Sequence, residues 1–275
     1  MAKQKGQNPI EGTIGNTTFY KHPAFGWLLR EKSSLDKDKI YRDPSFEYTL
    51  NNAAEFKRAT LAAMQLRHAF HAALKPIKDV WLSGRMNALL LETIKSDQVS
   101  RWGERCVQNG QVSRLEGFNF CKNTKLDAVF PVGCNSELDP VTGKMNIDIP
   151  SFIPQQKLAP PGGATFFKII SVAASAGFAK ELPIGYVQES GLMAIDQQMV
   201  PALHIEHAVV TSPGQFLLLT LGIVFYAIPG NIPADLISKR KRLRLGKGDA
   251  PVAYAGALMI LRTAVAAAAS KPSIQ

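Results

Sequence analysis

The spacing of apolar residues divides the chain into a first part with a helical period and a second part built of short apolar segments. Small and apolar residues recur three or four positions apart in one set between residues 43 and 74: Phe56, Ala59, Ala63, Leu66, Phe70 and Ala73. This spacing is that of one face of an α-helix. Asp43 and Pro44 favour a helix start, and Pro76 favours its end. The sequence therefore predicts a long helix over residues 43–74.

A second face of the same predicted helix mixes apolar and cationic residues: Lys57, Leu61, Met64, His68, His71 and Lys75. A helix with two partly apolar faces is expected to pack against two neighbours. Residues 80–94 predict a second helix, with Leu82, Met86 and Leu89 on one side. The short connection at Pro76 predicts that the two helices form an antiparallel pair.

The first thirty residues predict a β-hairpin. Residues 12–21 are rich in threonine and aromatic residues and predict the first strand. Residues 22–26 are of types common in turns, and residues 27–30 predict the second, returning strand. A lone hairpin is marginally stable in water. We therefore expect this hairpin to pack against the helices, the second domain or another subunit.

From residue 146 onward the apolar segments are short and are separated by clusters of proline and glycine. The apolar segments cover residues 146–149, 165–172, 184–187, 205–210, 216–228 and 252–261. Several short strands with such punctuation predict an antiparallel β-sandwich. The whole chain is thus expected to be an α+β protein: a β-hairpin and helical domain over residues 1–125, followed by a β-sandwich-like domain over residues 126–275.

Charge is distributed unevenly along the 275 residues. The chain has 32 Lys and Arg against 22 Asp and Glu, a net charge of +10. Residues 1–125 carry 20 of these cations and 12 of the acids, and six of the 12 remaining cations lie between residues 239 and 247. The positive charge is therefore local, which favours a particular acidic surface as a partner over general adhesion.

Separated islands of the sequence resemble an uncharacterised bacterial family found mainly in Bacteroidota. The similar segments are MAKQKG at the start, GTIGNTTFYK at residues 12–21, DPSF at 43–46, PGGATFF at 161–167 and LGIVFY at 221–226. The resemblance implies only an order of parts: a β-hairpin, a helical pair and a β-rich C-terminal domain. It brings no activity and no catalytic residues.

Motifs that carry catalysis do not appear in the sequence. There is no Gly-x-Ser-x-Gly elbow, no P-loop lysine after the glycines at residues 12–15, and no Gly-x-Gly-x-x-Gly before a helix. The three cysteines have no zinc-clip spacing. We therefore expect no catalytic residues, no metal, no cofactor and a protein that is not an enzyme.

Two pairs of histidines are candidate metal ligands, and for both a structural role is favoured. His68 and His71 are neighbours on a helix, but Lys75 one turn away repels a cation. His204 and His207 lie on a predicted strand, where residues three positions apart point to opposite faces. Glu206 is expected to share a face with His204, and His207 to point the other way.

No segment of the sequence predicts a secretion signal or a membrane-spanning helix. The basic start at Lys3 and Lys5 is not followed by an apolar stretch of signal-peptide length. Residues 216–228 are apolar, but about 20 residues are needed to span a bilayer. We expect a cytoplasmic protein with reduced thiols.

The sharpest charged feature is a basic run at residues 239–247. In a strand, Lys239 and Lys241 would point to one face, and Arg240, Arg242 and Arg244 to the other. Three guanidinium groups in a row suit phosphate or carboxylate groups. The alternatives are a solvated edge strand or a subunit contact, and both are favoured over nucleic acid because no known nucleic-acid-binding motif accompanies the run.

These features together predict a structural protein that assembles with copies of itself. The aromatic residues of the hairpin are the candidates for subunit contacts: Phe19, Tyr20, Phe25 and Trp27. Completing the core of their own domain is an equally good role for them. The runner-up is a nucleic-acid-associated protein that uses the basic run and the basic helical face. A carbohydrate- or peptide-binding sandwich is a third alternative, by analogy of fold alone.

Overall fold

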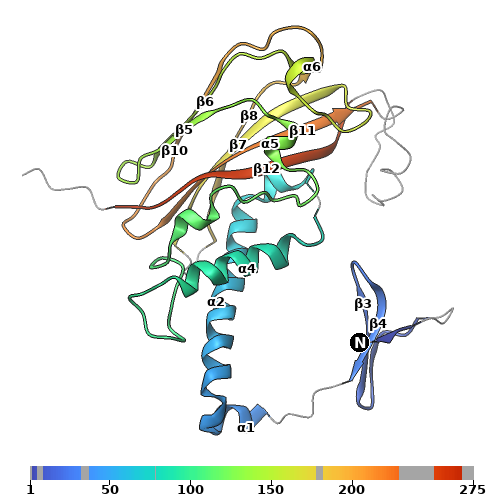
Figure 1. Ribbon diagram of the computed structural model, residues 1–275, viewed down its shortest axis with the longest axis vertical. Coiled ribbons are helices and arrows are strands. Elements are labelled where there is room, and N and C mark those ends of the chain that lie inside the picture. The colour runs from blue at the N-terminus through green and yellow to red at the C-terminus, as the bar shows by residue number, and fades with distance from the viewer. Residues whose placement is uncertain are drawn as a thin grey trace, which may run out of the picture. The chain divides into compact units, whose positions relative to one another are not determined.

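A computed structural model of the chain (Figure 1) describes residues 2–4, 9–31, 37–77, 79–177, 182–228 and 251–267. Its helices and antiparallel sheets confirm an α+β fold with a β-rich C-terminal region. The chain divides into two units, Met1–Ala54 and Glu55–Gln275. This division differs from the predicted domains 1–125 and 126–275.

The N-terminal unit begins with a four-stranded antiparallel sheet in the order β1-β4-β3-β2. The predicted hairpin corresponds to β3 (Thr17–His22) and β4 (Gly26–Glu31). β1 (Ala2–Lys3) was not predicted, and the single strand predicted over residues 12–21 is divided by a turn into β2 (Gly12–Ile14) and β3. Gly15, with a φ of +56°, makes the tight turn from β2 to β3.

The long helical segment is divided into several pieces. After α1 (Lys37–Arg42), Asp43 accepts a hydrogen bond from the Ser45 N–H at 3.0 Å and caps the short 3-10 helix η1 (Pro44–Phe46). The main helix α2 (Glu47–Ala69) follows, and Phe70 separates it from α3 (His71–Leu74). The helix start predicted at Asp43 is therefore confirmed, whereas the single helix over residues 43–74 is interrupted.

The second predicted helix is α4 (Leu82–Lys95). In Figure 1 it runs across α2 rather than alongside it, so the helices do not align as the expected antiparallel pair. The connection is longer than a tight corner because α3 and residues 75–81 intervene. Within this connection Asp79 accepts a hydrogen bond from the Trp81 N–H at 2.8 Å and pairs with Arg85 at 2.8 Å.

The β-rich region contains two sheets. The larger has the order β12-β11-β7-β8, with β9 also paired to β7, and the smaller has the order β10-β6-β5. Their strands are β5 (Asn135–Leu138), β6 (Lys144–Ile149), β7 (Phe166–Ala176), β8 (Gly185–Glu189), β9 (Met193–Ala194), β10 (Leu203–Ala208), β11 (Phe216–Ala227) and β12 (Val252–Val265).

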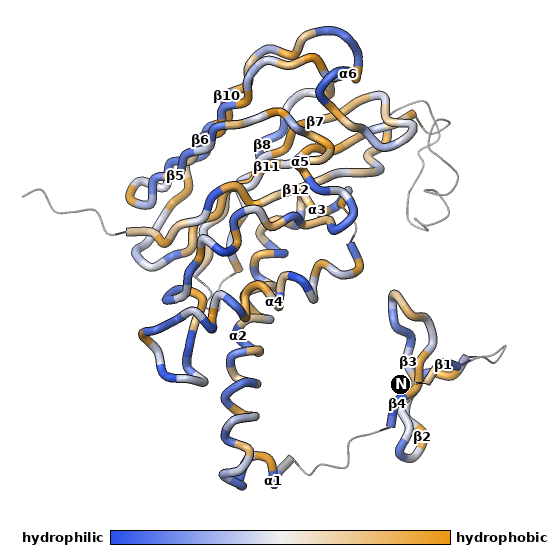
Figure 2. Tube along the Cα trace, in the orientation of Figure 1, coloured by the Kyte–Doolittle hydropathy of each residue, from blue (hydrophilic) through white to orange (hydrophobic). Residues whose placement is uncertain are grey.

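The larger sheet is covered on both faces, which gives the Glu55–Gln275 unit three layers. Leu218 belongs to a core shared with residues of α2 and α4, and its neighbour Leu219 belongs to a core shared with β6. A central strand that is buried on both faces needs apolar residues at nearly every position. Figure 2 shows β11 accordingly in hydrophobic colours, and all its residues except Tyr226 are buried.

The helical core explains why the predicted boundary at residue 125 does not separate two units. Leu66 of α2 and Leu90 of α4 are fully buried in the same cluster as Ile170 of β7 and Leu258 of β12. The short elements η2 (Val112–Leu115), α5 (Leu126–Val129) and α6 (Pro154–Lys157) lie in the connecting segments. Helices and sheets are one folding unit because neither can bury its apolar face alone.

Candidate subunit-contact surface

One face of the N-terminal sheet gathers most of its apolar side chains. The strand register places Phe19 opposite Leu29, and Leu29 opposite Ala2. Trp27 is opposite Lys21, two positions along the strands and therefore on the same face. Because paired residues of an antiparallel sheet point to one side, we define the Phe19 face by these apolar residues: Ala2, Ile14, Phe19, Trp27 and Leu29.

The opposite face of the sheet is built around Tyr20. Tyr20 is paired with Leu28, and Leu28 with Lys3. The guanidinium of Arg30 lies 5.7 Å from the centre of the Tyr20 ring, a cation–π contact. This face is therefore more polar than the Phe19 face, although it holds the best-buried side chain of the sheet, Leu28.

The turn between β3 and β4 holds Phe25 beside His22. Their ring centres are 4.8 Å apart with an angle of 29° between the planes. The backbone N–H groups of Ala24 and Phe25 both donate to His22 Nδ1, at 3.1 and 3.2 Å. Phe25 is 54% exposed at this turn.

The four predicted contact residues are thus divided among three places. Phe19 and Trp27 share a face, Tyr20 lies on the reverse face and Phe25 lies in the turn. The alternation of β3 already separates Phe19 from Tyr20, and this signal was available in the sequence. The prediction that all four contact a partner stays untested.

The N-terminal unit buries very little apolar surface. Among its described residues Leu28 is the one hydrophobic residue that is buried, with 5% of its surface exposed. Phe19, Tyr20 and Trp27 are half-buried, and Ile14 is 60% exposed. Taken by itself, this sheet lacks the covered face that a stable sheet requires.

A second exposed surface lies on α2 and α3. The second helical set of the sequence, from Lys57 to Lys75, is solvent-exposed at every position. Leu61 is 47% exposed and Met64 is 46% exposed. Acidic residues are absent from the exposed positions of residues 55–75, because Glu55 is fully buried. We call this set the basic face of α2; it was expected to pack against a neighbour, and in the structure it is exposed at every position.

His68 and His71 are both exposed on this basic face. No group of three or more His, Cys, Asp or Glu side chains in the described parts of the chain is arranged to hold a metal ion. Cys106, Cys121 and Cys134 are free thiols. Burial raises the pKa of the Cys134 thiol, and the charge of Asp127 adds to this effect.

The strand β10 carries the second histidine pair, with the expected divergence of faces. His204 and Glu206 are exposed, whereas His207 is buried. His204 Nδ1 lies 2.6 Å from Asp148 Oδ1 on β6, and this hydrogen bond raises the pKa of His204. The pair borders an open cleft of about 410 Å³. Both side chains are more than half exposed, so the contact contributes little to stability.

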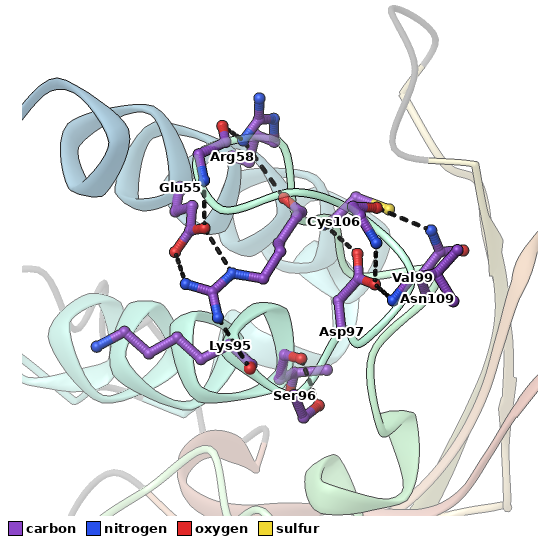
Figure 3. A network of polar contacts seen from close by, with 12 residues as sticks. Glu55, Arg58, Lys95, Ser96, Asp97, Val99, Cys106 and Asn109 are labelled. Atoms are coloured by element: carbon purple, nitrogen blue, oxygen red, sulfur yellow. Dashed lines mark hydrogen bonds and ion pairs between the residues drawn. The ribbon is translucent and has the colours of Figure 1, made fainter. Parts of the chain in front are cut away.

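A buried polar network joins α2 to the segment after α4 (Figure 3). Arg105 donates to both carboxylate oxygens of Glu55, from Nε at 2.7 Å and from Nη2 at 3.0 Å. The Gly103 N–H also donates to Glu55, at 2.9 Å, and Arg58 donates to the Gly103 carbonyl at 2.6 Å. Such a bidentate pair is strong and directional.

Asp97 organises the other half of this network. Its carboxylate accepts from the backbone N–H groups of Val99, Ser100 and Cys106, at 2.8 to 3.0 Å. Burial alone would raise the pKa of Asp97, but these hydrogen bonds outweigh it and hold the pKa well below its usual range. The carboxylates of Glu55 and Asp97 are thus engaged by the protein itself, which makes the network structural.

The basic run lies outside the described residues. This applies to Lys239, Lys241, Arg240, Arg242 and Arg244. Their predicted role in binding phosphate or an acidic partner stays a prediction. Among the described helices none is long and apolar enough to cross a membrane.

The comparisons with known proteins gave no match. No protein-family model, no curated protein and no solved structure matches the chain. The resemblance to an uncharacterised bacterial family therefore stays a hypothesis.

Proposed function

We propose that this chain is a non-enzymatic structural protein that assembles with copies of itself through its N-terminal sheet. The observation that carries the proposal is the small buried area of that sheet. Four strands with apolar side chains on the Phe19 face bury one hydrophobic residue among them. A sheet of this kind gains stability when its apolar face is covered.

The Phe19 face of a second copy of the chain would cover the Phe19 face of the first. Two N-terminal sheets stacked by their Phe19 faces would form a two-layer sandwich and bury the same residues on both sides. Phe19 and Leu29 would then occupy the centre of the contact, and Trp27 would flank them on the same face, where aromatic residues contribute strongly to affinity. Lys21 is directly opposite Trp27, with its ammonium 5.4 Å from the centre of the Trp27 ring, and Glu31 is opposite Thr17. Both charged residues are exposed and suit a polar border of the contact.

Light scattering after size-exclusion chromatography tests the proposal on the full chain at physiological salt. The wild type is expected to form multimers, and Phe19→Asp is expected to shift it toward monomer, because a buried carboxylate opposes stacking. Thr13→Asp is the matched control, since Thr13 lies on the reverse face of the same sheet. A strictly monomeric wild type over the whole concentration range would contradict the proposal.

A nucleic-acid-associated function is the second candidate, and the basic face of α2 favours it. Lys57, His68, His71 and Lys75 follow one exposed side of the helical segment without an acidic residue among them. Contacts of such cations with phosphates release counterions and depend steeply on salt. We expect retention of DNA or RNA in a filter-binding assay at low salt, with losses in a Lys57→Glu/Lys75→Glu variant and in an Arg240→Glu/Arg242→Glu/Arg244→Glu variant. Absence of retention would reject this candidate.

A further inference from the structure

A buried histidine joins the two sheets of the β-rich region. His207 of β10 is 2% exposed and points into the layer between the sheets, opposite to its neighbours His204 and Glu206. Its strand partner Met145 of β6 points into the same layer and is fully buried. His207 is thus an ionisable side chain in a layer built mainly of apolar residues.

The hydrogen bonds of His207 cross from one sheet to the other. His207 Nε2 lies 2.9 Å from Ser171 Oγ on β7, and Ser171 is fully buried. Ser171 Oγ donates its single proton to the Thr220 carbonyl of β11 at 3.0 Å. Nε2 therefore carries a proton and donates it to Ser171, as both the neutral and the charged imidazole can do; burial in the apolar layer is what favours the neutral form.

Near the register position of His207, the buried side chains of the same layer provide no charge to balance a proton. From β6 they are Met145 and Ile147, from β7 Ile169 and Ala173 beside Ser171, and from β11 Leu219 and Leu221. The charged residues that neighbour it in the smaller sheet, Glu206 and Lys144, lie on the exposed face. Burial accordingly lowers the pKa of His207.

Two other titratable groups of this core lie away from His207. Cys134 directly precedes Asn135, which is paired with Asp148 near the end of β6. Met145, the partner of His207, lies near the start of β6. Tyr254 of β12 donates its hydroxyl proton to the carbonyls of Pro161 and Gly162. Burial raises the pKa of Cys134 and so favours its neutral thiol, and Tyr254 acts as a proton donor, so neither offsets a charged imidazole.

We propose that His207 is an acid-sensitive latch, whose protonation releases strand β10 from the larger sheet. A proton taken from solvent at Nδ1 turns the neutral donor into an imidazolium that the apolar layer cannot solvate. Hydration of this charge requires β10 to open. β10 is an edge strand, paired on one side to β6 in the described sheet, so it can open without breaking a second ladder. Opening also releases the Gln188 side chain of β8, which donates to the Glu206 carbonyl of β10.

The direction of the effect follows from the lowered pKa. At pH values above 6.5, the ordinary histidine value, His207 is neutral in both the closed and the open state and costs nothing. As the pH falls below this value, His207 becomes protonated in the open state but stays neutral in the closed state. The equilibrium constant for closing β10 onto the larger sheet therefore falls with acidification. Uptake of one proton lowers it by at most tenfold per pH unit.

Hydrogen exchange of the full chain, measured by mass spectrometry between pH 7.5 and 5.5 and corrected for intrinsic rates, tests the latch. We expect protection of the β10 amides to fall severalfold, up to about tenfold per pH unit below 6.5, while β11 and β12 keep theirs. His207→Leu should remove this dependence, since Ser171 keeps its bond to Thr220. His204→Gln is the control on the same strand and should preserve it.

Several results would overturn the latch. They are protection of β10 that does not change with pH, an equal loss in His207→Leu, or a loss spread evenly over both sheets. If His207→Leu fails to fold, His207→Gln replaces it. An NMR titration of the wild-type imidazoles is the independent measurement: His207 titrating at or above its ordinary value would reject the proposal, and titration below that value together with the β10 response supports it.

Discussion

Single residues decide how closely the helical layer approaches the larger sheet. Gly185, the first residue of β8, lies against the backbone carbonyl of Ala69 at the end of α2. A Cβ atom at Gly185 would collide with that carbonyl, and a backbone atom yields less readily than the end of a side chain. The absence of a side chain at Gly185 is thus a packing requirement, although its φ is not in the left-handed region.

The Gly185→Ala substitution is expected to destabilise the fold. The helix end has to move away from β8, which costs about 1–3 kcal/mol, the usual range for overpacking. Gly191→Ala is the matched control, because a Cβ atom there meets nothing within 4 Å. Urea unfolding of both variants measures the difference, and equal midpoints would show that α2 does not approach β8 this closely.

At the scale of elements, α2 is a helix with one side buried in the core and the opposite side partly exposed to solvent. Its residues Ala59, Ala63 and Leu66 are fully buried, whereas Leu61 and Met64 on the opposite side are nearly half exposed. Periodicity predicted both sets, but it could not state which one faces the core. Alanines in the buried set allow close approach of the neighbouring elements, which is the physical reason that this set faces inward.

Two leucines of α2 provide a matched comparison. Leu66→Ala is expected to lower the free energy of unfolding by about 2–5 kcal/mol, because it leaves a cavity in the helical core. Leu61→Ala, the same change on the exposed side, is expected to alter it by less than about 0.5 kcal/mol. Chemical denaturation of the two variants gives both numbers. A similar loss for the two would mean that Leu61 is also covered, for example by a second copy.

On the scale of the whole molecule, the two units differ in how they are stabilised. Both hydrophobic cores lie in the Glu55–Gln275 unit, and the Met1–Ala54 unit buries Leu28 alone among its described hydrophobic residues. The apolar cores that stabilise the chain are thus those of the Glu55–Gln275 unit. The N-terminal sheet is the part that gains most from a partner.

Removal of residues 1–36 separates folding from assembly. The shortened chain is expected to keep the thermal unfolding midpoint of the β-rich unit, because the deletion removes no residue of either core. It is also expected to lose the multimers of the full chain. Differential scanning calorimetry and light scattering measure the two properties; a multimer that survives the deletion would place the contact outside the N-terminal sheet.

Local patterns of residues predicted the types of element and much of their order. Turn residues and β-branched or aromatic runs predicted the β3–β4 hairpin, Asp43 and Pro44 predicted the helix start, and the alternation in β10 predicted the divergence of His204 and His207. These features depend on interactions within a few residues, which a local pattern records. The strand β1 was missed because two residues are too few for a pattern, and β2 was merged with β3 because the threonine-rich composition continues through the turn at Gly15.

Tertiary structure alone decided how the elements combine. The sequence suggested a boundary at residue 125, yet Leu66, Leu90 and Leu258 meet in one core that spans both predicted domains. It also gave no sign that Ser171 and Thr220 would meet His207, or that Glu55 would bind Arg105. Such contacts join residues 36 to 50 positions apart. Local spacing does not encode them, because they form only when packing of the apolar layers brings distant segments together.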